Sequence, residues 1–316
     1  MKIVYVTGCL GFMGSYFTRQ ALNRGWHVRG IDKMTYASNN ELLKEFKNYP
    51  NFAFDKCDIK NLNNLYDCDY VVNFAAESHV GNSIVNSDKF IESNINGVKN
   101  LLENVRIKPV NCNDRPILFH ISTDEVYGDI IEGSHTENDL LRPSNPYSAS
   151  KAAADMLIHA WSRTYEIKYI ILRPTNNYGI GQYPEKLIPL SIKNLMRGKK
   201  IRLHNGGTPT RNWLHASDTA NAVMTIIDSG KVNEIYNVAG GFEQKNIDTV
   251  KKIIKAFKET LDNWENYVDF SVVREGQDLR YALDDSKLRK LGWKTEKIFD
   301  EEISSIVRHH KTNYVW

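Results

Sequence analysis

Apolar and polar positions alternate along the first half of the chain in a rhythm of strands and helices. Short apolar runs predict strands at 3–6, 27–32, 70–76 and 116–121. Between them, apolar residues recur at helical spacing over about 14–25 and 87–105. Strands that alternate with helices in this way indicate βαβ units, with helices on both faces of a parallel sheet. We therefore predict an α/β fold built on a doubly wound parallel sheet.

The second half of the chain breaks this rhythm. A strand pattern at 169–179 is followed by a segment punctuated by Pro and Gly. Helices are then predicted at 187–197, 216–229 and 246–261, and short strands near 200–204 and 234–238. We expect residues 1–174 to form one domain and residues 175–316 a smaller α/β lobe, some segments of which return to the first domain.

Composition narrows the class of protein. The chain of 316 residues is 41% hydrophobic and 25% charged, which is typical of a globular protein with a sizeable core. Its net charge of +3 comes with no dense Lys/Arg block, so no nucleic-acid partner is expected. Apolar runs are too short for a signal peptide or a membrane span, which predicts a cytoplasmic protein. Cys9, Cys57, Cys68 and Cys112 lack metal-binding spacing, so we expect reduced packing residues and no metal.

Three glycines, Gly8, Gly11 and Gly14, form the pattern TGxxGxxG between the first predicted strand and the following helix. Without side chains there, backbone N–H groups and the helix N-terminus can approach a pyrophosphate. Asp32 closes the next strand, where a carboxylate can bind the adenosine ribose and repel a 2′-phosphate, so NAD is expected over NADP. The neighbouring Lys33 would weaken that discrimination. The alternatives are a tight turn at the glycines and a strand-end turn at Asp32.

Tyr147 and Lys151 lie four residues apart on a predicted helix that starts after Pro146, hence on one helix face. A lysine ammonium near a phenol favours the phenolate, which can accept a proton near neutral pH, and the same lysine can hold a nicotinamide ribose. The alternative is an incidental pair on a solvated helix face.

Two carboxylates, Asp124 and Glu125, directly follow the buried strand 116–121 and Thr123. Adjacent carboxylates at the mouth of a core strand lose hydration and repel each other. Their repulsion separates their pKa values, so that one can act as an acid and the other as a base. The alternative is that they cap a loop or form an ion pair with a cation such as Arg142.

These motifs together resemble the extended short-chain dehydrogenase/reductase superfamily over nearly the whole chain. The resemblance rests on TGxxGxxG, the Tyr147/Lys151 pair and the stretch NFAA. Within the superfamily, the nucleotide-diphosphate-glucose 4,6-dehydratases are similar at "AAESHV", "STDEVYG", "NPYSASKA", "NNYG", "PEKLIP", "RNWLH" and "LGW". The Thr-Asp-Glu element distinguishes the 4,6-dehydratases from the epimerases, decarboxylases and reductases of the superfamily, because those enzymes generally carry other residues there. The resemblance implies a Rossmann-type sheet with a C-terminal lobe that binds the substrate.

The resemblance also implies a reaction and a homodimer. Tyr147 would take the C4 hydroxyl proton, Glu125 the C5 proton, and Asp124 would protonate the departing C6 hydroxyl, while Thr123 bonds the C4 oxygen. A reversible hydride transfer to NAD then gives a 4-keto-6-deoxy sugar without net use of the cofactor. Superfamily relatives usually dimerise through two helices per subunit, which here are those at 87–105 and 148–165.

The ligand contacts that the resemblance implies cover both lobes. For NAD they are Gly8, Gly11, Phe12, Met13, Gly14, Asp32, Lys33, Thr35, Asp58, Ile59, Ala75, Ala76, Ser78, Ser93, Tyr147, Lys151 and Asn177. Asp58 could instead be only a helix cap. For the sugar nucleotide they are Ser78, Thr123, Asn176, Lys186, Leu187, His204, Arg211, Asn237 and Arg274.

The substrate expected from loop-level resemblance is UDP-glucose. His204, Gln277 and Leu279 depart from the bacterial dTDP-glucose pattern, and Asn82 and the run "DLRYALDDSKLRKLGW" are nearer the plant-type UDP-glucose dehydratase of rhamnose synthesis. We therefore expect UDP-glucose 4,6-dehydration in deoxysugar biosynthesis. The alternatives are dTDP-glucose as substrate, 4-epimerisation of a nucleotide sugar, and a non-catalytic NAD-sensing or scaffold protein on the same fold.

Overall fold

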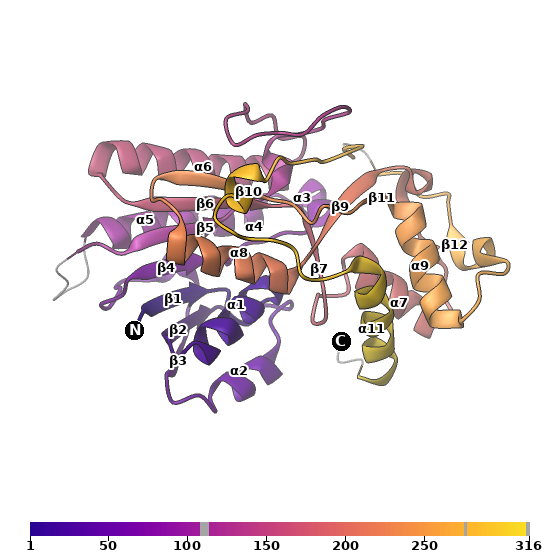
Figure 1. Cartoon of the computed structure of the whole chain (residues 1–316), viewed down its shortest axis with the longest axis horizontal. Coiled ribbons are helices and arrows are strands. Elements are labelled where there is room, and N and C mark those ends of the chain that lie inside the picture. The colour runs from indigo at the N-terminus through magenta and orange to yellow at the C-terminus, as the bar shows by residue number, and fades with distance from the viewer. Residues whose placement is uncertain (108–113, 275–276, 314–316) are drawn as a thin grey trace.

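The computed structural model describes residues 1–107, 114–274 and 277–313, and Cys112 lies outside them. Its larger part is a parallel sheet of seven strands, with helices on both faces (Figure 1). The strands are β1 (Ile3–Thr7), β2 (His27–Asp32), β3 (Phe52–Lys56), β4 (Tyr70–Asn73), β5 (Ile117–Ile121), β6 (Tyr169–Pro174) and β10 (Glu234–Val238). The predicted α/β fold is confirmed.

The order of the strands is β10-β6-β5-β4-β1-β2-β3. From β1 the chain first builds the sheet toward β3 and then returns to β4 on the other side of β1. Such a reversal leaves a crevice outside the carboxyl ends of the two strands. The glycine turn follows β1 and Ala75 follows β4, so both lie at this crevice.

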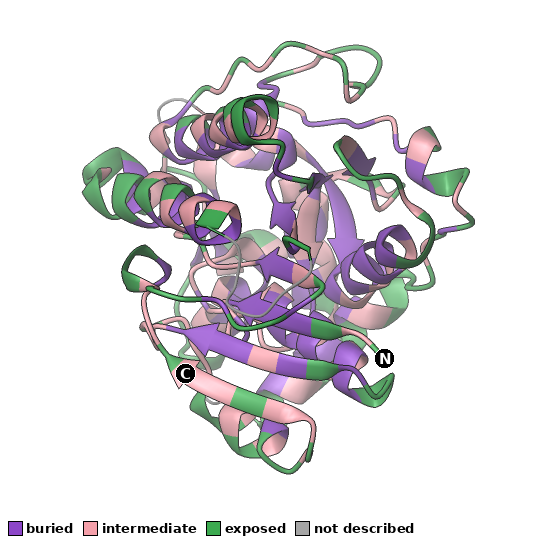
Figure 2. Cartoon of the chain, turned by 90° about the vertical axis from the view of Figure 1, so that its left-hand side faces the viewer, coloured by how far each residue is buried: buried purple, intermediate pink, exposed green. Residues whose placement is uncertain are grey.

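Two apolar layers cover the sheet, because neighbouring residues of a strand face opposite sides. Val4 and Val6 pack in the core under α1 (Phe12–Asn23) and α8 (Ala216–Ser229), whereas Tyr5 packs under α5 (Gly97–Ile107) and α6 (Pro146–Tyr165). Figure 2 shows the central strands as mostly buried, with exposed residues gathered on the outer faces of the helices.

The helix predicted over 87–105 is wrong as a single helix. The segment comprises α4 (Asp88–Phe90), the π-helical turn η2 (Ile91–Asn96) and α5. The wider turn places Asn94 in the interior, where its amide donates to Ser150 Oγ (2.9 Å) and to the carbonyl of Glu77 (3.0 Å). Apolar spacing does not reveal such a turn, which is frequent at functional sites.

The second lobe has its own core between small sheets and three helices. Its strands are β7 (Asn176–Tyr178), β9 (Thr210–His215) and β11 (Glu243–Lys245) in one sheet, and β8 (Ile201–Arg202) and β12 (Val268–Asp269) in another. Its helices are α7 (Leu187–Met196), α9 (Asn246–Lys258) and α11 (Phe299–Thr312). Between these segments the chain passes back through β10, a strand of the large sheet, and α8, a helix that packs on it.

The remaining elements are short, and most were not predicted. They are α2 (Asn40–Phe46), η1 (Ile59–Asn61), α3 (Val80–Val85), η3 (Asp124–Val126), η4 (His204–Gly207), η5 (Trp264–Tyr267) and α10 (Ser286–Arg289). Within the described ranges, no helix combines the length and apolar character that crossing a membrane would require.

Candidate active site

The glycine turn after β1 is packed so closely that side chains cannot be accommodated. A Cβ on Gly14 would lie 2.2 Å from the carbonyl oxygen of Gly8, and one on Gly8, whose φ is +68°, would lie 2.8 Å from Ala75 N. Gly11 starts α1 without a side-chain cap, and the first turn carries no acidic residue. The N-terminus of α1, which this turn leaves open, therefore suits an anion such as a pyrophosphate.

Asp32 holds the turn after β2 and lies at the crevice where the ribose is expected. Its buried carboxylate accepts hydrogen bonds from Leu10 N (3.1 Å), Met34 N (2.7 Å) and Ser38 Oγ (2.8 Å), and so organises the turn after β2. It also lines the crevice beside the glycine turn. A carboxylate can accept about four hydrogen bonds, which leaves capacity for a ribose hydroxyl.

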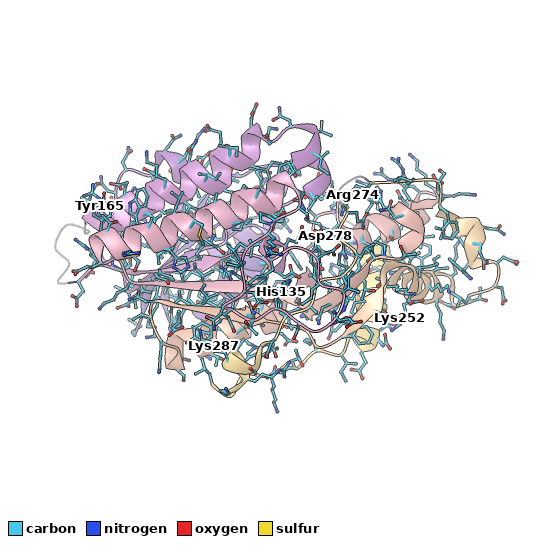
Figure 3. The ribbon with its side chains drawn as sticks, turned by 90° about the horizontal axis from the view of Figure 1, so that it is seen from above. His135, Tyr165, Lys252, Arg274, Asp278 and Lys287 are labelled. Carbon is cyan, nitrogen blue, oxygen red and sulfur yellow. The ribbon has the colours of Figure 1, made fainter. Side chains whose placement is uncertain are left out.

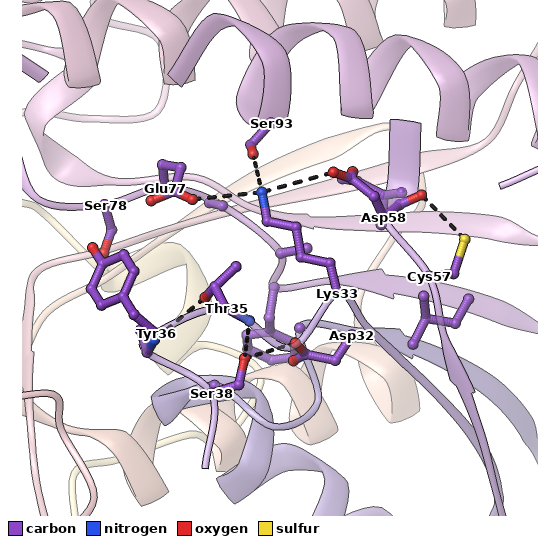
Figure 4. Close-up of a pocket in the computed structure, with 18 of the residues that line it drawn as sticks. Asp32, Lys33, Thr35, Tyr36, Ser38, Cys57, Asp58, Glu77, Ser78 and Ser93 are labelled. Atoms are coloured by element: carbon purple, nitrogen blue, oxygen red, sulfur yellow. Dashed lines mark hydrogen bonds and ion pairs between the residues drawn. The ribbon is translucent and has the colours of Figure 1, made fainter. Parts of the chain in front are cut away.

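Lys33 points away from Asp32, across the cavity (Figure 4). Its Nζ lies 2.9 Å from Ser93 Oγ, 3.6 Å from Glu77 and 3.9 Å from Asp58. The two carboxylates balance its charge, so Lys33 does not neutralise Asp32. Asp58 also caps η1 by accepting from Lys60 N (3.1 Å), and it lines the same cavity.

Two adjoining cavities at the crevice collect nearly all the predicted cofactor residues. The first is lined by Gly8, Gly11, Asp32, Lys33, Thr35, Asp58, Ile59, Ala75, Ala76, Ser78 and Ser93. The second adds Phe12, Met13, Gly14, Tyr147 and Lys151. Asn177 is the exception, because it lines a third cavity on the other lobe and its side chain bonds Thr219 Oγ1 (2.6 Å) and the carbonyl of Thr175 (3.0 Å).

The helix that carries Tyr147 and Lys151 starts with a capping box between Asn145 and Ser148, and with Pro146 in its first turn. Both functional side chains are buried, so the solvated-face alternative is wrong. Lys151 Nζ donates to the carbonyl of Ile121 (2.7 Å), and burial lowers the pKa of this amine to about 8.

The expectation that Lys151 favours a phenolate is not met in this structure. Burial raises the pKa of Tyr147, and the carboxylates of Glu125 and Asp124 raise it further, whereas a hydrogen bond with Thr123 opposes the shift. Lys151 is turned toward β5 rather than toward the phenol. Tyr147 is therefore a neutral phenol here.

The acidic pair lies beside Tyr147, in unlike surroundings. Asp124 is 3% exposed, and its Oδ1 accepts from Thr123 Oγ1 (3.1 Å) while its Oδ2 has no partner within the described protein. Burial, followed by the charge of Glu125, raises the pKa of Asp124 to about 8. Glu125 is less buried and is approached by Asn145 Nδ2 and Tyr281 OH, each at 3.4 Å. These contacts, rather than an ion pair with Arg142, surround the pair.

The third cavity lies between Glu125 and the second lobe. It is lined by the predicted residues Asn176, Lys186, Leu187, His204, Arg211 and Arg274. Figure 3 shows Arg274 and Asp278 near the N-terminal end of α6, where the two lobes meet. Six of the lining residues carry a buried polar side-chain atom without a partner within the described protein: Asn176, His204, Trp213, Asn246, Arg274 and Gln277. Buried polar groups are normally hydrogen-bonded, so this cavity suits a polar, anionic ligand.

The contacts of Asn237 do not fit the prediction that it binds the substrate. Asn237 is fully buried, and its Oδ1 accepts from Tyr127 OH (2.9 Å) while its Nδ2 donates to the carbonyl of His135 (3.1 Å). It lines none of these three cavities. It follows from these contacts that Asn237 joins β10 to the loop after η3.

Sequence reasoning missed the residue shared by all three cavities. Glu185 lines each of them, and its carboxylate accepts from Tyr36 OH (3.1 Å) across the cofactor crevice. The ring of Tyr36 also contacts that of Tyr183 edge to face, with centroids 5.0 Å apart. Tyr281, which approaches Glu125, was likewise not predicted. Glu185 lies in the stretch PEKLIP and Tyr281 in the run DLRYALDDSKLRKLGW, but neither stretch indicates these contacts, because the partners are distant in the sequence.

Comparison with known proteins agrees with this geometry. Residues 5–306 match the family described as GDP-mannose 4,6 dehydratase. A probable dTDP-glucose 4,6-dehydratase of Sinorhizobium fredii is 39% identical over 99% of this chain and 94% of its own length. The low-salt glycan biosynthesis protein Agl12 of Haloferax volcanii is 37% identical over 97% of this chain and 98% of its own length.

Among solved structures, the dTDP-glucose 4,6-dehydratase DesIV of Streptomyces venezuelae, with NAD and TYD bound, superposes with a TM-score of 0.91. It is 35% identical, and the match covers 98% of this chain and 97% of that one. The chain therefore belongs to the GDP-mannose 4,6 dehydratase family, among the nucleotide-sugar 4,6-dehydratases of the extended short-chain dehydrogenase/reductase superfamily.

Proposed function

We propose that the chain catalyses the NAD-dependent 4,6-dehydration of dTDP-glucose to the 4-keto-6-deoxy sugar nucleotide. The observation that carries the proposal is the pair of Asp124, buried with a raised pKa, and the less buried Glu125, both beside Tyr147. An elimination needs one carboxyl group that donates a proton and another that accepts one.

The crevice fits the cofactor. The backbone N–H of Phe12, at the start of α1, would hold the pyrophosphate, Asp32 the adenosine ribose, and Lys151 the nicotinamide ribose. When bound, NAD supplies a reversible acceptor for the hydride that leaves sugar C4 and later returns at C6. Phe12 and Met13, with Ala76, give that end of the crevice an apolar wall.

At C4, Tyr147 is the group that removes the hydroxyl proton. Thr123 would hydrogen-bond the same oxygen, because its hydroxyl already contacts the Tyr147 phenol. Since the phenol is neutral here, Tyr147 must lose its proton before it can act, and Lys151 is the cation that stabilises the phenolate once its side chain turns toward the phenol.

At C5 and C6, the acidic pair performs the elimination. The C4 carbonyl acidifies the C5 hydrogen, which Glu125 removes, while Asp124 gives its proton to the departing C6 hydroxyl. A pKa of about 8 keeps Asp124 protonated at neutral pH, as an acid catalyst requires. Water leaves, and the two carboxyl groups have then exchanged protonation states. When the hydride returns to C6, the protonated Glu125 gives a proton to C5, and the proton taken from the C4 hydroxyl balances the one that Asp124 gave up.

The diphosphate would lie in the third cavity. Arg211 is held by the carbonyls of Thr210 (2.7 Å) and Asp278 (3.0 Å) and stacks on Tyr281, while Arg274 Nε lacks a partner within the described protein. Two guanidinium groups at one cavity suit a diphosphate, which accepts paired hydrogen bonds.

The choice of nucleotide departs from the expectation drawn from sequence. Loop residues such as His204 favoured UDP-glucose, but the names of the relatives and the solved structure favour dTDP-glucose. His204 and Asn246 line the cavity, and each carries a polar atom that lacks a partner among the described residues and is available to a pyrimidine.

The test offers the purified chain, supplemented with NAD, equal concentrations of dTDP-glucose and UDP-glucose in separate reactions in deuterated water. The proposal expects a product lighter by one water, deuterium at C5, and a kcat/KM at least about tenfold higher for dTDP-glucose. A preference for UDP-glucose would restore the original substrate expectation. A product of unchanged mass would favour 4-epimerisation, and NAD binding without turnover would favour a non-catalytic role.

We also propose a homodimer formed through α5 and α6. Ile107 and Met156 on these helices are 70% and 49% exposed, and Ile91 beside them is 42% exposed. Apolar side chains on adjacent helices suit a symmetric helical interface. Light scattering on the purified chain, with Met156→Glu as the disrupting variant, tests this assembly.

A further inference from the structure

A buried chain of hydrogen bonds ends at Lys151 and plays no part in the function proposed above. Thr7 Oγ1 donates to Asn73 Oδ1 (2.6 Å), and Asn73 Nδ2 donates to His120 Nδ1 (2.9 Å). His120 Nε2 lies 3.2 Å from Lys151 Nζ. All four side chains are at most 2% exposed, and they come from β1, β4, β5 and α6. Solvent therefore cannot replace any of these contacts.

The order of donors and acceptors fixes the position of the imidazole hydrogen. The backbone N–H of Ala75 donates to Thr7 Oγ1 (3.4 Å), and the Thr7 hydroxyl in turn donates to Asn73. Asn73 thus presents its N–H to His120, so Nδ1 accepts and Nε2 carries the hydrogen of a neutral ring. Burial, aided by the charges of Lys151 and Arg173, lowers the pKa of His120 well below its usual range.

The N–H of the His120 ring points at Lys151 Nζ, and it therefore interacts differently with the neutral amine and with the ammonium group. A neutral amine has a lone pair that accepts this hydrogen, whereas an ammonium group only donates. The amine still donates to the carbonyl of Ile121 (2.7 Å). The contacts of His120 therefore favour the uncharged form.

The charged neighbours of Lys151 include one that opposes this preference. Asp155, one helical turn away and 4.0 Å from His120 Nε2, raises the pKa of Lys151, although it also forms a buried ion pair with Arg173 of β6 (3.0 Å). Tyr147, on the preceding turn of α6, is a neutral phenol. Burial of an ammonium group is costly and is the larger effect, so the pKa of Lys151 is lowered to about 8.

We propose that Thr7, Asn73 and His120 are positioning residues that favour the uncharged amine of Lys151 over the ammonium group before ligands bind. An uncharged Lys151 that turns toward Tyr147 can take the phenolic proton: the O–H bond breaks, an N–H bond forms, and the products are phenolate and ammonium with no net change in charge. This consequence rests on the proposed function, but the charge state of Lys151 does not.

Thr7→Val isolates the effect of the hydrogen-bond chain on the charge of Lys151. The substitution is isosteric, and Thr7 does not contact Lys151 directly but acts through Asn73 and His120. Without the hydroxyl, the Asn73 amide can turn, His120 can move its hydrogen to Nδ1, and Nε2 can accept from an ammonium group. The pKa of Lys151 should rise by roughly 0.5 to 1 pH unit, the effect of about one neutral hydrogen bond.

The measurement is a ¹³C NMR titration of the cofactor-stripped full chain with labelled lysine, in which the Lys151 signal is assigned by its loss in Lys151→Arg. Thr18→Val is the matched control, because Thr18 is fully buried on α1 and its Oγ1 has no partner within the described protein. It should leave the Lys151 titration unchanged. A Thr7→Val titration that coincides with that of the wild type overturns the proposal.

A second measurement keeps the proposal falsifiable if Thr7→Val does not fold. Two-bond ¹H–¹⁵N correlations of the histidine rings, with His120→Gln for assignment, distinguish a hydrogen on Nε2 from one on Nδ1. The proposal expects the Nε2–H form of His120 in the wild-type chain at neutral pH. An Nδ1–H ring or an imidazolium there overturns it. Neither measurement needs turnover, so failure of the proposed function would leave this test valid.

Discussion

Asp124 and Glu125 are neighbours in the chain, yet their carboxyl groups meet different surroundings. Asp124 is enclosed and bonded by Thr123 Oγ1 (3.1 Å), whereas Glu125 faces the cavity and is approached by Tyr281 OH (3.4 Å). The single-residue step along η3 thus gives one group the environment of an acid and the other that of a base.

Asp124→Asn and Glu125→Gln should each slow the elimination by about 10²–10⁴-fold, the usual contribution of one acid or base group. Oxidation at C4 should be affected less, because Tyr147 carries it. Rapid mixing with dTDP-glucose should then show reduced nicotinamide accumulating by absorbance. Equal loss of both steps would contradict these roles.

The raised pKa of Asp124 predicts how activity depends on pH. An acid catalyst works only while protonated, so the rate of elimination should fall as pH rises through about 8. In Asp124→Asn this alkaline limb should disappear from the small residual rate. Single-turnover measurements across pH 6 to 9 give the comparison.

The same carboxyl group predicts a pH-dependent stability. Its pKa is higher in the folded chain than in the unfolded chain, so the folded state binds the proton more tightly and stability is lost between the ordinary pKa, 3.8, and about 8. Asp124→Asn should therefore raise the melting temperature near pH 8 by about 2 °C or more and have less effect at pH 5. A lower melting temperature at both pH values would contradict this.

Tyr36 and Glu185 should retain the cofactor, because their hydrogen bond (3.1 Å) bridges the crevice. Tyr36→Phe should speed NAD dissociation by roughly fivefold, the kinetic equivalent of about 1 kcal/mol. Tyr49→Phe is the control, since Tyr49 OH bonds Asn23 (2.9 Å) away from the cavities. Stopped-flow displacement of NAD measures both, and equal rates in the two variants would exclude a bridging role.

Asn237→Ala should destabilise the fold without weakening substrate binding. The change leaves the Tyr127 hydroxyl without its acceptor and the His135 carbonyl without its donor, at a cost of about 1–3 kcal/mol in the free energy of unfolding. The KM for the sugar nucleotide should stay unchanged. A tenfold higher KM with normal stability would restore Asn237 as a substrate contact.

Sequence predicted the parts of the site whose residues lie close together in the chain. The glycine turn, the Tyr147/Lys151 pair and the Asp124/Glu125 pair each sit on one element or one connection, where local spacing fixes geometry. The parallel sheet was predictable for the same reason, because strand and helix patterns alternate within short segments.

Residues that reach the site from a distance were not predicted. Glu185 meets Tyr36 across 149 positions, and Tyr281 meets Glu125 across 156, so only the packed fold brings them together. The charge state of Tyr147 was likewise misjudged, because spacing on a helix does not tell which way the Lys151 side chain turns.

The position of β10 at the edge of the large sheet limits how this enzyme can be divided. A fragment that ends at residue 174 would lack the strand that pairs with β6 and the helix that packs on α1, and would leave Ile170 and Leu172 uncovered. Chimeras that exchange the second lobe between relatives must therefore be joined at several points, on both sides of α8 and β10. The two lobes are thus to be expressed and engineered as one folding unit.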